Sequence, residues 1–388
     1  MTAQLENNAF NRHEEELERP TPFLEVEIDH LQRNVEGIRA AFRGADLYYA
    51  LKCNPHPSIL HCLHEAGVGF EIASLSELRL VEEAGVEASR LACFHTIKSP
   101  AFLQCLSQSR VDRLAVDSLQ EVQQIARYCP GAKVFVRLDT GTQFSRLLLN
   151  KKFGCSHHRA MQLLRCAQEL GLNPFGITIH VGSQCEQVGD WQRAAEACYR
   201  LADEALGGGI PLQAFSLGGG LPVSYQEPVI SLAEIAEVML SAISAADPHG
   251  QLQFMLEPGR AIVSTAGKLH ASVIAIAERD DATWVYLDVG IYHGLSEKLS
   301  LHGGFVLPIE TQHPHRGTRA YRLAGPTCDS TDTLPGIYNL PELHVGDRVT
   351  FRCAGSYTTS LATGFNGFAP PSTRVSASSN RYWHGGAK

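Results

Sequence analysis

The sequence predicts an α/β fold, a (β/α)8 TIM barrel followed by a C-terminal β-domain, and three observations lead to this prediction. Between residues 28 and 262, eight short apolar runs alternate with amphipathic stretches, the pattern of βα units on a parallel sheet. This region is close to the ~250 residues usual for such a barrel. After about residue 265 the pattern changes to alternating segments without long helices, which is typical of β-structure.

Each element of the barrel is expected from its own apolar run. The runs are Leu47–Lys52, Gly69–Ser74, Arg90–His95, Arg113–Ser118, Lys133–Asp139, Phe175–Gly182, Leu212–Gly219 and Phe254–Arg260. Helical patterns occupy residues 28–42, 74–85, 157–171 and 190–206. A doubly wound open sheet is the alternative, but no G-x-G-x-x-G motif follows the first run, where a dinucleotide-binding sheet would carry it. We expect a barrel over residues 28–262 and a β-domain over residues 263–388, joined by residues 1–27.

Composition and charge exclude several classes of protein. The net charge of −8 argues against nucleic acid as a partner, because phosphate backbones are bound by clustered Lys and Arg. The eleven cysteines contain no C-x-x-C pair, so neither a disulfide framework nor a metal site is expected. No stretch reaches the ~18 apolar residues of a membrane span. We therefore expect a cytoplasmic protein that does not bind a membrane.

Lys52 ends the first run, in YYALKCNPHP. In a barrel, the C-terminal ends of the strands form the active-site face. A lysine that is partly desolvated there is expected to have a lowered pKa, and its neutral amine could attack an aldehyde. The alternative is a surface lysine whose methylene stem covers apolar neighbours.

The sixth and seventh runs end in further candidates. His180 and Ser183 follow in ITIHVGSQC, where an imidazole could stack on a planar cofactor and a hydroxyl could bind phosphate; a structural, hydrogen-bonded histidine is the alternative. Gly218, Gly219 and Gly220 follow in AFSLGGGLP, where bare backbone N–H groups can approach a phosphate. Residues 207–209, also three glycines, are predicted to form only a helix end and turn.

The eighth run ends in FMLEPGRAIV. Glu257 could pair with a pyridine nitrogen and Arg260 could bind phosphate, whereas a structural ion pair between them is the alternative. In the β-domain, polar turn-rich segments hold Cys328, Asp329 and Tyr357, and such loops often carry function. Cys328 could equally be a small buried hydrophobic residue.

In this order, the segments YYALKCN, FEIAS, HVGSQ, GGG, EPGR, GPTCDS and GSYTTS…FNGF resemble the ornithine/diaminopimelate/arginine decarboxylase family of pyridoxal 5'-phosphate (PLP) enzymes. The resemblance runs from TPFLEV at residue 21 to FNGFAPP and is closest to bacterial ornithine and lysine/ornithine decarboxylases. It implies an alanine-racemase-like barrel with a β-domain. It also implies PLP as cofactor and decarboxylation of a basic amino acid, ornithine to putrescine or lysine to cadaverine.

The resemblance also implies a role for each matching residue. Lys52 would bind the cofactor as a Schiff base, Glu257 would hold the ring nitrogen, and His180 would stack on the ring. Residues implied to hold the phosphate or other cofactor atoms are Ser183, Gly218, Gly219, Gly220, Gly259, Arg260, Tyr357, Glu71, Glu77 and Arg137.

Substrate residues are implied in the β-domain. Cys328 would return a proton to Cα after CO₂ leaves, Asp329 would bind the distal amine, and Tyr357 would also contact the substrate. The resemblance implies a homodimer in which Cys328 and Asp329 reach the neighbouring subunit's cofactor.

Several alternatives stay open. The substrate could be diaminopimelate or a conjugated amino acid of a siderophore or antibiotic pathway, because the family includes such enzymes. A racemase on the same fold and a non-catalytic regulatory homologue are further alternatives, and intact Lys52, Glu257 and Cys328 argue against the regulator. Asp288 lies one residue from an acidic substrate-binding position of eukaryotic members, and we assign it no role.

Overall fold

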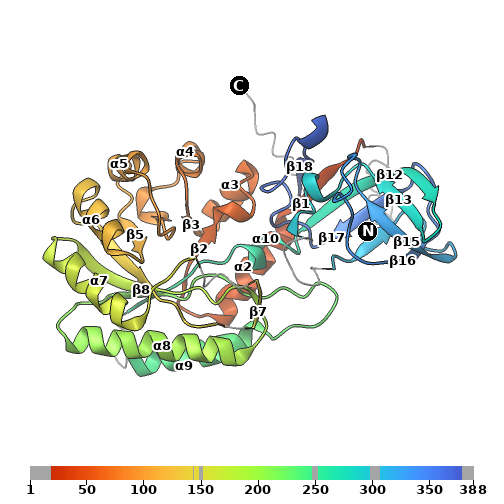
Figure 1. Cartoon of the computed structure of the whole chain (residues 1–388). Helices are drawn as coiled ribbons and strands as arrows, with labels where there is room; N and C mark the ends of the chain where they lie inside the picture. The colour runs from red at the N-terminus through yellow and green to blue at the C-terminus, as the bar shows by residue number, and fades with distance from the viewer. Residues whose placement is uncertain (1–18, 143, 148–151, 247–251, 298–305, 378–388) are drawn as a thin grey trace, which may run out of the picture. The chain divides into compact units, whose positions relative to one another are not determined.

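The computed structural model describes residues 19–142, 144–147, 152–246, 252–297 and 306–377. The chain divides into two compact units (Figure 1). One unit, the barrel unit, comprises residues 28–264. The other, the β-unit, is made by residues 19–27 together with residues 265–376. Each unit is described below by itself.

Eight parallel strands form the core of the barrel unit. Their order around the sheet is β4-β3-β2-β11-β10-β8-β6-β5. An additional parallel bridge between Cys93 and Leu114 joins the two ends of this order; there the Cys93 N–H donates to Arg113 O and the Ala115 N–H to Cys93 O, both at 2.9 Å. The predicted barrel is therefore confirmed. The strands are β2 (Asp46–Ala50), β3 (Gly69–Glu71), β4 (Leu91–Ala92), β5 (Arg113–Val116), β6 (Lys133–Arg137), β8 (Asn173–Thr178), β10 (Ala214–Ser216) and β11 (Gln253–Leu256).

A helix follows each barrel strand, and Figure 1 shows these helices around the strands, with α8 and α9 side by side. The barrel helices are α2 (Ile28–Ala41), α3 (Pro57–Glu65), α4 (Leu75–Glu83), α5 (Pro100–Gln108), α6 (Leu119–Tyr128), α7 (His157–Glu169), α8 (Val188–Gly207), α9 (Leu232–Ala246) and α10 (Arg260–Val263). All four predicted helical patterns are present. A small antiparallel pair, β7 (Ser145–Leu147) and β9 (Ser183–Cys185), lies in the connections after β6 and β8.

Serine caps define where several barrel helices begin. The Ser74 hydroxyl accepts the Glu77 N–H at 3.2 Å at the start of α4, which satisfies one of the unpaired N–H groups of a first helical turn. The Glu77 carboxylate reaches back to the Ala73 N–H at 2.6 Å. Together these bonds fix the short turn that follows Glu71, the last residue of β3. Similar caps are Ser99, Ser118 and Ser156.

The barrel interior is filled by large side chains from most of its strands, as is usual in this fold. Phe135 of β6 lies in the middle, with ring centroids 4.9 Å from Phe94 and 5.5 Å from Phe175. On β8, a side chain at Gly176 would meet the Phe135 ring at 2.6 Å, so the glycine makes room for the phenylalanine. The whole buried cluster is Tyr48, Ala92, Phe94, Ala115, Phe135, Phe175, Ala214 and Met255.

The β-unit is a mainly antiparallel sheet that the amino-terminal strand joins. β1 (Phe23–Glu27) pairs antiparallel with β12 (Gly267–Glu278) and parallel with β18 (Ser372–Ser376), so segments distant in sequence share one sheet. The remaining strands are β13 (Thr283–Leu287), β14 (Ile309–Thr311), β15 (Thr318–Ala324), β16 (Tyr338–Pro341) and β17 (Arg348–Arg352). The described part of the chain after residue 265 is therefore mainly β-structure, as expected.

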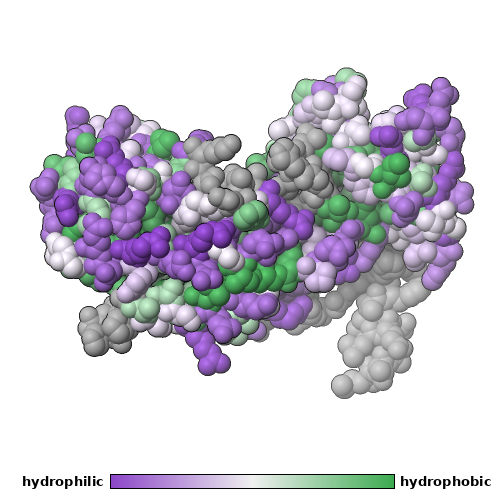
Figure 2. Space-filling view, turned by 60° about the horizontal axis from the view of Figure 1, so that its bottom comes forward, coloured by the Kyte–Doolittle hydropathy of each residue, from purple (hydrophilic) through white to green (hydrophobic). Residues whose placement is uncertain are grey.

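The surface shown in Figure 2 is mostly hydrophilic, with hydrophobic side chains gathered in smaller areas. Over the described ranges, none of the helices combines the length and the apolar character needed to cross a membrane.

Truncating Phe135 tests the packing of the barrel interior. We expect Phe135→Ala to lower the free energy of unfolding by about 3–5 kcal/mol, because it leaves a cavity among buried rings. Urea unfolding followed by circular dichroism measures this change. The matched control is Phe144→Ala, whose side chain is 61% exposed and whose loss should change stability by less than about 0.5 kcal/mol. Equal losses in the two variants would contradict the assignment of Phe135 to the core.

Candidate active site

Lys52 lies in a 3-10 turn, Leu51–Cys53, directly after β2. The predicted strand is therefore shorter than the apolar run, and it ends at Ala50. The Lys52 Nζ atom is 3.7 Å from Oε2 of Glu71, which is buried at the end of β3, whereas the lysine side chain is 52% exposed. The Glu71 carboxylate raises the pKa of Lys52. The expected lowering of this pKa is wrong, because attraction to a nearby carboxylate outweighs the effect of desolvation.

Glu257 follows β11 and is held by two hydroxyl groups. Thr178, the last residue of β8, donates a hydrogen bond to its Oε1 at 3.0 Å. Ser216, the last residue of β10, donates to the same oxygen. Burial, and then the charge of Glu71, raise the pKa of Glu257 to about 7, although the Ser216 hydrogen bond and the cations Lys52 and Arg137 oppose this rise. A carboxyl group with such a pKa can hold or release a proton near neutral pH.

His180 lies two residues beyond β8 as a neutral imidazole. Its Nδ1 accepts the Gly182 N–H at 3.0 Å, so in the neutral ring the proton is on Nε2. Burial lowers the pKa of His180 well below its ordinary value, and the positive charges of Arg137 and Lys52 lower it further. The ring therefore adds no positive charge to the site.

The glycine loop after β10 has backbone that only glycine can provide. Gly218 and Gly220 have φ of +65° and +98°, in the left-handed region that disfavours side chains. A side chain at Gly218 would overlap the Ile179 carbonyl oxygen, and one at Gly219 would lie 2.8 Å from the Glu257 carbonyl oxygen. The main chain of this loop therefore packs closely against the ends of β8 and β11, and a phosphate could approach its bare backbone.

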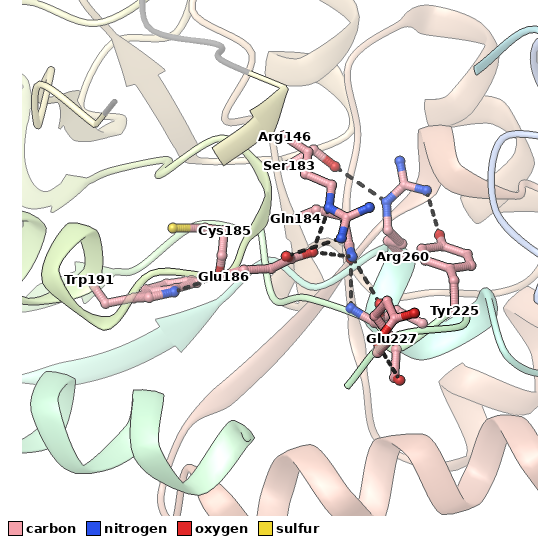
Figure 3. A network of polar contacts seen from close by, with 11 residues as sticks. Arg146, Ser183, Gln184, Cys185, Glu186, Trp191, Tyr225, Glu227 and Arg260 are labelled. Carbon is pink, nitrogen blue, oxygen red and sulfur yellow. Dashed lines mark hydrogen bonds and ion pairs between the residues drawn. The ribbon is translucent and has the colours of Figure 1, made fainter. Parts of the chain in front are cut away.

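Beside this loop, Arg260 and Ser183 lie in one polar network (Figure 3). The buried Arg260 guanidinium donates to Ser183 Oγ at 3.3 Å and to the Tyr225 hydroxyl at 2.9 Å. Gln184 fixes the loop that carries Tyr225, because its side-chain amide makes hydrogen bonds to both the N–H and the carbonyl of Val223, at 2.6 and 2.9 Å. Arg260 contacts Ser183 and Tyr225. Glu257 instead contacts Thr178 and Ser216. An ion pair between Glu257 and Arg260, the alternative given above, is not among these contacts.

Gly259 and Arg137 complete the predicted residues of the barrel unit. A side chain at Gly259 would overlap the sulfur of Cys53, so this glycine lets the EPGR segment approach the turn that carries Lys52. Arg137 is the last residue of β6, and burial lowers the pKa of its guanidinium while Glu257 and Asp117 oppose that effect.

Three contributors to these networks were missed by sequence reasoning. Thr178 and Ser216 are hydroxyl residues at the last positions of their strands, where in a barrel they point to the site. That position is the only signal that could have marked them. Tyr225 lies in an irregular loop, LPVSYQEP, and we find no sequence pattern that marks it.

The remaining predicted residues belong to the β-unit. Cys328 is exposed, so its interpretation as a buried hydrophobic residue is wrong, and its Sγ lies 3.4 Å from Asn366 Oδ1. Asp329 accepts hydrogen bonds from the Tyr292 hydroxyl at 3.1 Å and from Thr331, and these bonds lower the pKa of Asp329. Tyr357 is half-buried in a turn, with φ of +60°.

A cavity of about 760 Å³ lies within the β-unit, with Cys328 and Asp329 on its wall. Aromatic Trp284 and Tyr286 also line it. Acidic side chains outnumber basic ones among the lining residues, so the cavity has the charge and the aromatic faces that suit a cation. The acidic lining residues are Glu278, Asp280, Asp281, Asp329 and Asp332, and the basic one is Arg279.

The residues of the barrel unit fit PLP chemically. Lys52 provides an amine for an aldehyde, and Glu257 provides a carboxyl partner for a ring nitrogen. The glycine loop, whose close packing excludes side chains, lies beside a buried arginine that hydrogen-bonds Ser183, a combination suited to a phosphate.

Comparison with known proteins agrees with this chemistry. Residues 28–264 match the family described as pyridoxal-dependent decarboxylase, pyridoxal binding domain. The chain is 34% identical over 350 residues to a lysine/ornithine decarboxylase of Selenomonas ruminantium, covering 90% of this chain and 88% of that protein. It is 30% identical to antizyme inhibitor 2 of Xenopus laevis, covering 83% and 73%.

A solved structure is also similar. The lysine/ornithine decarboxylase of Vibrio vulnificus, complexed with cadaverine, superposes with a TM-score of 0.84 at 31% identity, covering 92% of this chain and 93% of that one. Since the family match spans the whole barrel unit and the relatives align over both units, this chain belongs to the PLP-dependent decarboxylases.

Proposed function

We propose that this enzyme decarboxylates a free basic amino acid, L-ornithine or L-lysine, at a site built around Lys52. The observation that carries the proposal is that Lys52 and Glu257 follow neighbouring strands at one end of the barrel, while, within the β-unit, Asp329 lies on the wall of an acidic cavity. The first pair suits PLP, and the second feature suits a substrate with a distal ammonium group. The names of the bacterial relatives, lysine/ornithine decarboxylases, support the same choice.

In this proposal the barrel residues hold the cofactor and set its charge. Lys52 is its covalent anchor, and Ser183, Arg260 and the glycine loop bind its phosphate. When bound, PLP would accept the electron pair of the Cα–carboxylate bond that breaks as CO₂ leaves. Glu257 would hold a proton at the ring nitrogen, and the hydroxyls of Thr178 and Ser216 fix its carboxyl group by donating to Oε1.

The substrate is held and reprotonated by residues of the β-unit. Asp329 binds the distal ammonium, since its hydrogen bonds keep it ionised. The Cys328 thiol, exposed beside Asn366, donates a proton to Cα after CO₂ leaves. We also propose a two-fold dimer with two shared sites, as the family resemblance implies, in which Cys328 and Asp329 of one chain act at the cofactor of the other. A cytoplasmic location is part of the proposal, and the eleven free cysteines suit a reducing compartment.

The substrate assignment is tested with purified protein, PLP and a panel of ornithine, lysine, arginine, diaminopimelate and norleucine, by measuring CO₂ and amine products. We expect putrescine or cadaverine as the main product. Asp329→Ala should lower kcat/KM for the diamino acid about 100-fold, as for a lost charged contact, and Ser89→Ala, at an exposed position of the barrel unit, should leave it unchanged. Turnover of diaminopimelate alone would contradict the assignment, and PLP binding with no CO₂ from any substrate would indicate a regulatory protein.

Glu257→Gln separates a chemical from a structural role. We expect kcat to fall about 100-fold with little change in KM, because a charge needed in the transition state is lost.

In the apoprotein, the raised pKa of Glu257 means that the folded state holds a proton that the unfolded state releases, so stability falls as pH rises from about 4.5 to about 7. Above pH 7 the variant should therefore be more stable than wild type, by about 3 kcal/mol. A change confined to KM would contradict the role of Glu257 in the transition state, and the absence of a gain in stability would contradict its raised pKa.

Subunit mixing tests the shared site. We expect inactive Lys52→Ala and inactive Cys328→Ala proteins, after dissociation and reassociation, to recover about a quarter of wild-type activity, because half of randomly paired dimers are mixed and each has one intact site. Native mass spectrometry confirms the exchange. Exchange without recovery would contradict the shared-site model, and Cys328 would then serve its own chain or no chain.

A further inference from the structure

Phe153 links two residues that follow different barrel strands. The Arg137 guanidinium carbon, at the end of β6, lies 5.3 Å from the centroid of the Phe153 ring. The imidazole of His95, three residues beyond β4, lies 5.7 Å from the same ring at an interplanar angle of 87°. The Lys152 Nζ atom also lies 4.9 Å from this centroid. Phe153 therefore has two cations near its ring, Arg137 and Lys152, and an aromatic neighbour at right angles, which are favourable arrangements for an aromatic ring.

The Arg137 side chain has little else to fix its direction. Within the described ranges, its guanidinium makes no hydrogen bond or ion pair that would hold it, although the carboxylates of Glu257, Asp117 and Glu71 act on its pKa. A long side chain with several rotatable bonds loses much entropy when it is confined to one geometry. Stacking on the Phe153 ring can confine the Arg137 side chain and still leave its N–H groups available to bind a ligand.

The backbone on both sides of the ring is itself held. The fully buried Lys98 Nζ donates to the carbonyls of His95 and Ala115, each at 2.8 Å, and forms an ion pair with the Glu121 carboxylate at 2.7 Å. These contacts tie the segment of His95 to β5 and α6. Near Phe153, the Gly154 N–H donates to Asp117 at 3.0 Å. The Cys155 N–H donates to the Arg137 carbonyl, also at 3.0 Å.

Arg137 acts on the charged centre of the site. Burial is the largest cause of the lowered pKa of His180, and the charge of Arg137 adds to it, whereas the same charge opposes the raised pKa values of Lys52 and Glu257. A displaced guanidinium would therefore shift the pKa values of three groups that the proposed function uses. His95 itself is a neutral neighbour, because burial and the nearby Lys98 lower its pKa.

We propose that Phe153, supported at its edge by His95, is a positioning residue that holds the Arg137 guanidinium toward the cofactor. This inference rests on the proposed PLP site and adds two residues to it. Neither His95 nor Phe153 was singled out by sequence reasoning, because both roles depend on contacts between segments that are distant in sequence.

The test is a double-mutant cycle between Phe153→Leu and Arg137→Met in the full-length apoprotein. The readouts are the PLP dissociation constant, by equilibrium dialysis, and the visible absorption spectrum of the bound cofactor. We expect Phe153→Leu alone to weaken PLP binding about 3- to 30-fold, the range of a cation–π contact, and to alter the spectrum as Arg137→Met does. Phe153→Tyr, which keeps the ring, should restore both readouts, and Phe144→Leu is the control.

The cycle distinguishes positioning from a purely structural role. If Phe153 acts through Arg137, then Phe153→Leu should change the dissociation constant less than about twofold in the Arg137→Met background. His95→Leu should weaken binding only when Arg137 is present. Equal effects in both backgrounds would overturn the inference. Failure of the wild-type apoprotein to bind PLP covalently would instead overturn the proposed site, so the two failures are distinguishable.

Discussion

The site depends on one lysine placed between two carboxyl groups. Strand β2, which leads to Lys52, pairs with β3 on one side and with β11 on the other, and these neighbours lead to Glu71 and Glu257. Glu71 raises the pKa of Lys52, and it also raises that of Glu257. Burial and the nearby Glu71 charge therefore make Glu257 harder to ionise than an isolated glutamate. The order of the strands brings these charged groups together.

The remaining structure keeps this arrangement of charges in place. The hydroxyls of Thr178 and Ser216 bind Glu257 from two further strands, and Ser74 and Glu77 fix the turn after Glu71. A half-buried carboxyl group with a raised pKa lowers the stability of the fold at neutral pH. The packed interior around Phe135 supplies stability that offsets this cost, so the fold can hold a destabilising carboxyl group at its site.

Part of this description could be predicted from sequence. The eight apolar runs were enough to predict the barrel, because each run is a local pattern. The runs continue past the ends of the strands, however. Lys52 was therefore expected at the end of a strand, whereas it lies in the turn that follows. The sign of the Lys52 pKa shift could not be predicted, since it depends on a 3.7 Å distance to Glu71 on another strand. The pairing of β18 with β1 could not be predicted either, because it joins segments near opposite ends of the chain.

The same reasoning explains which site residues were found. Lys52, His180 and Glu257 occur in distinctive segments at the ends of apolar runs. Tyr225 and Phe153 occur in loops, where nothing local separates them from surface residues. His95 ends the apolar run Arg90–His95, but its role, like theirs, depends on a partner that folding brings to it.

The most direct test of the account is the pH dependence of covalent PLP capture at Lys52. Apoprotein is mixed with PLP at a series of pH values and reduced with borohydride, and the modified peptide is identified by mass spectrometry. The amine must be neutral to react, and Glu71 holds its pKa up. The account therefore predicts that capture maps to Lys52 and that Glu71→Gln moves the half-maximal rate to lower pH. Capture at another lysine, or an unchanged or higher midpoint in Glu71→Gln, would contradict it.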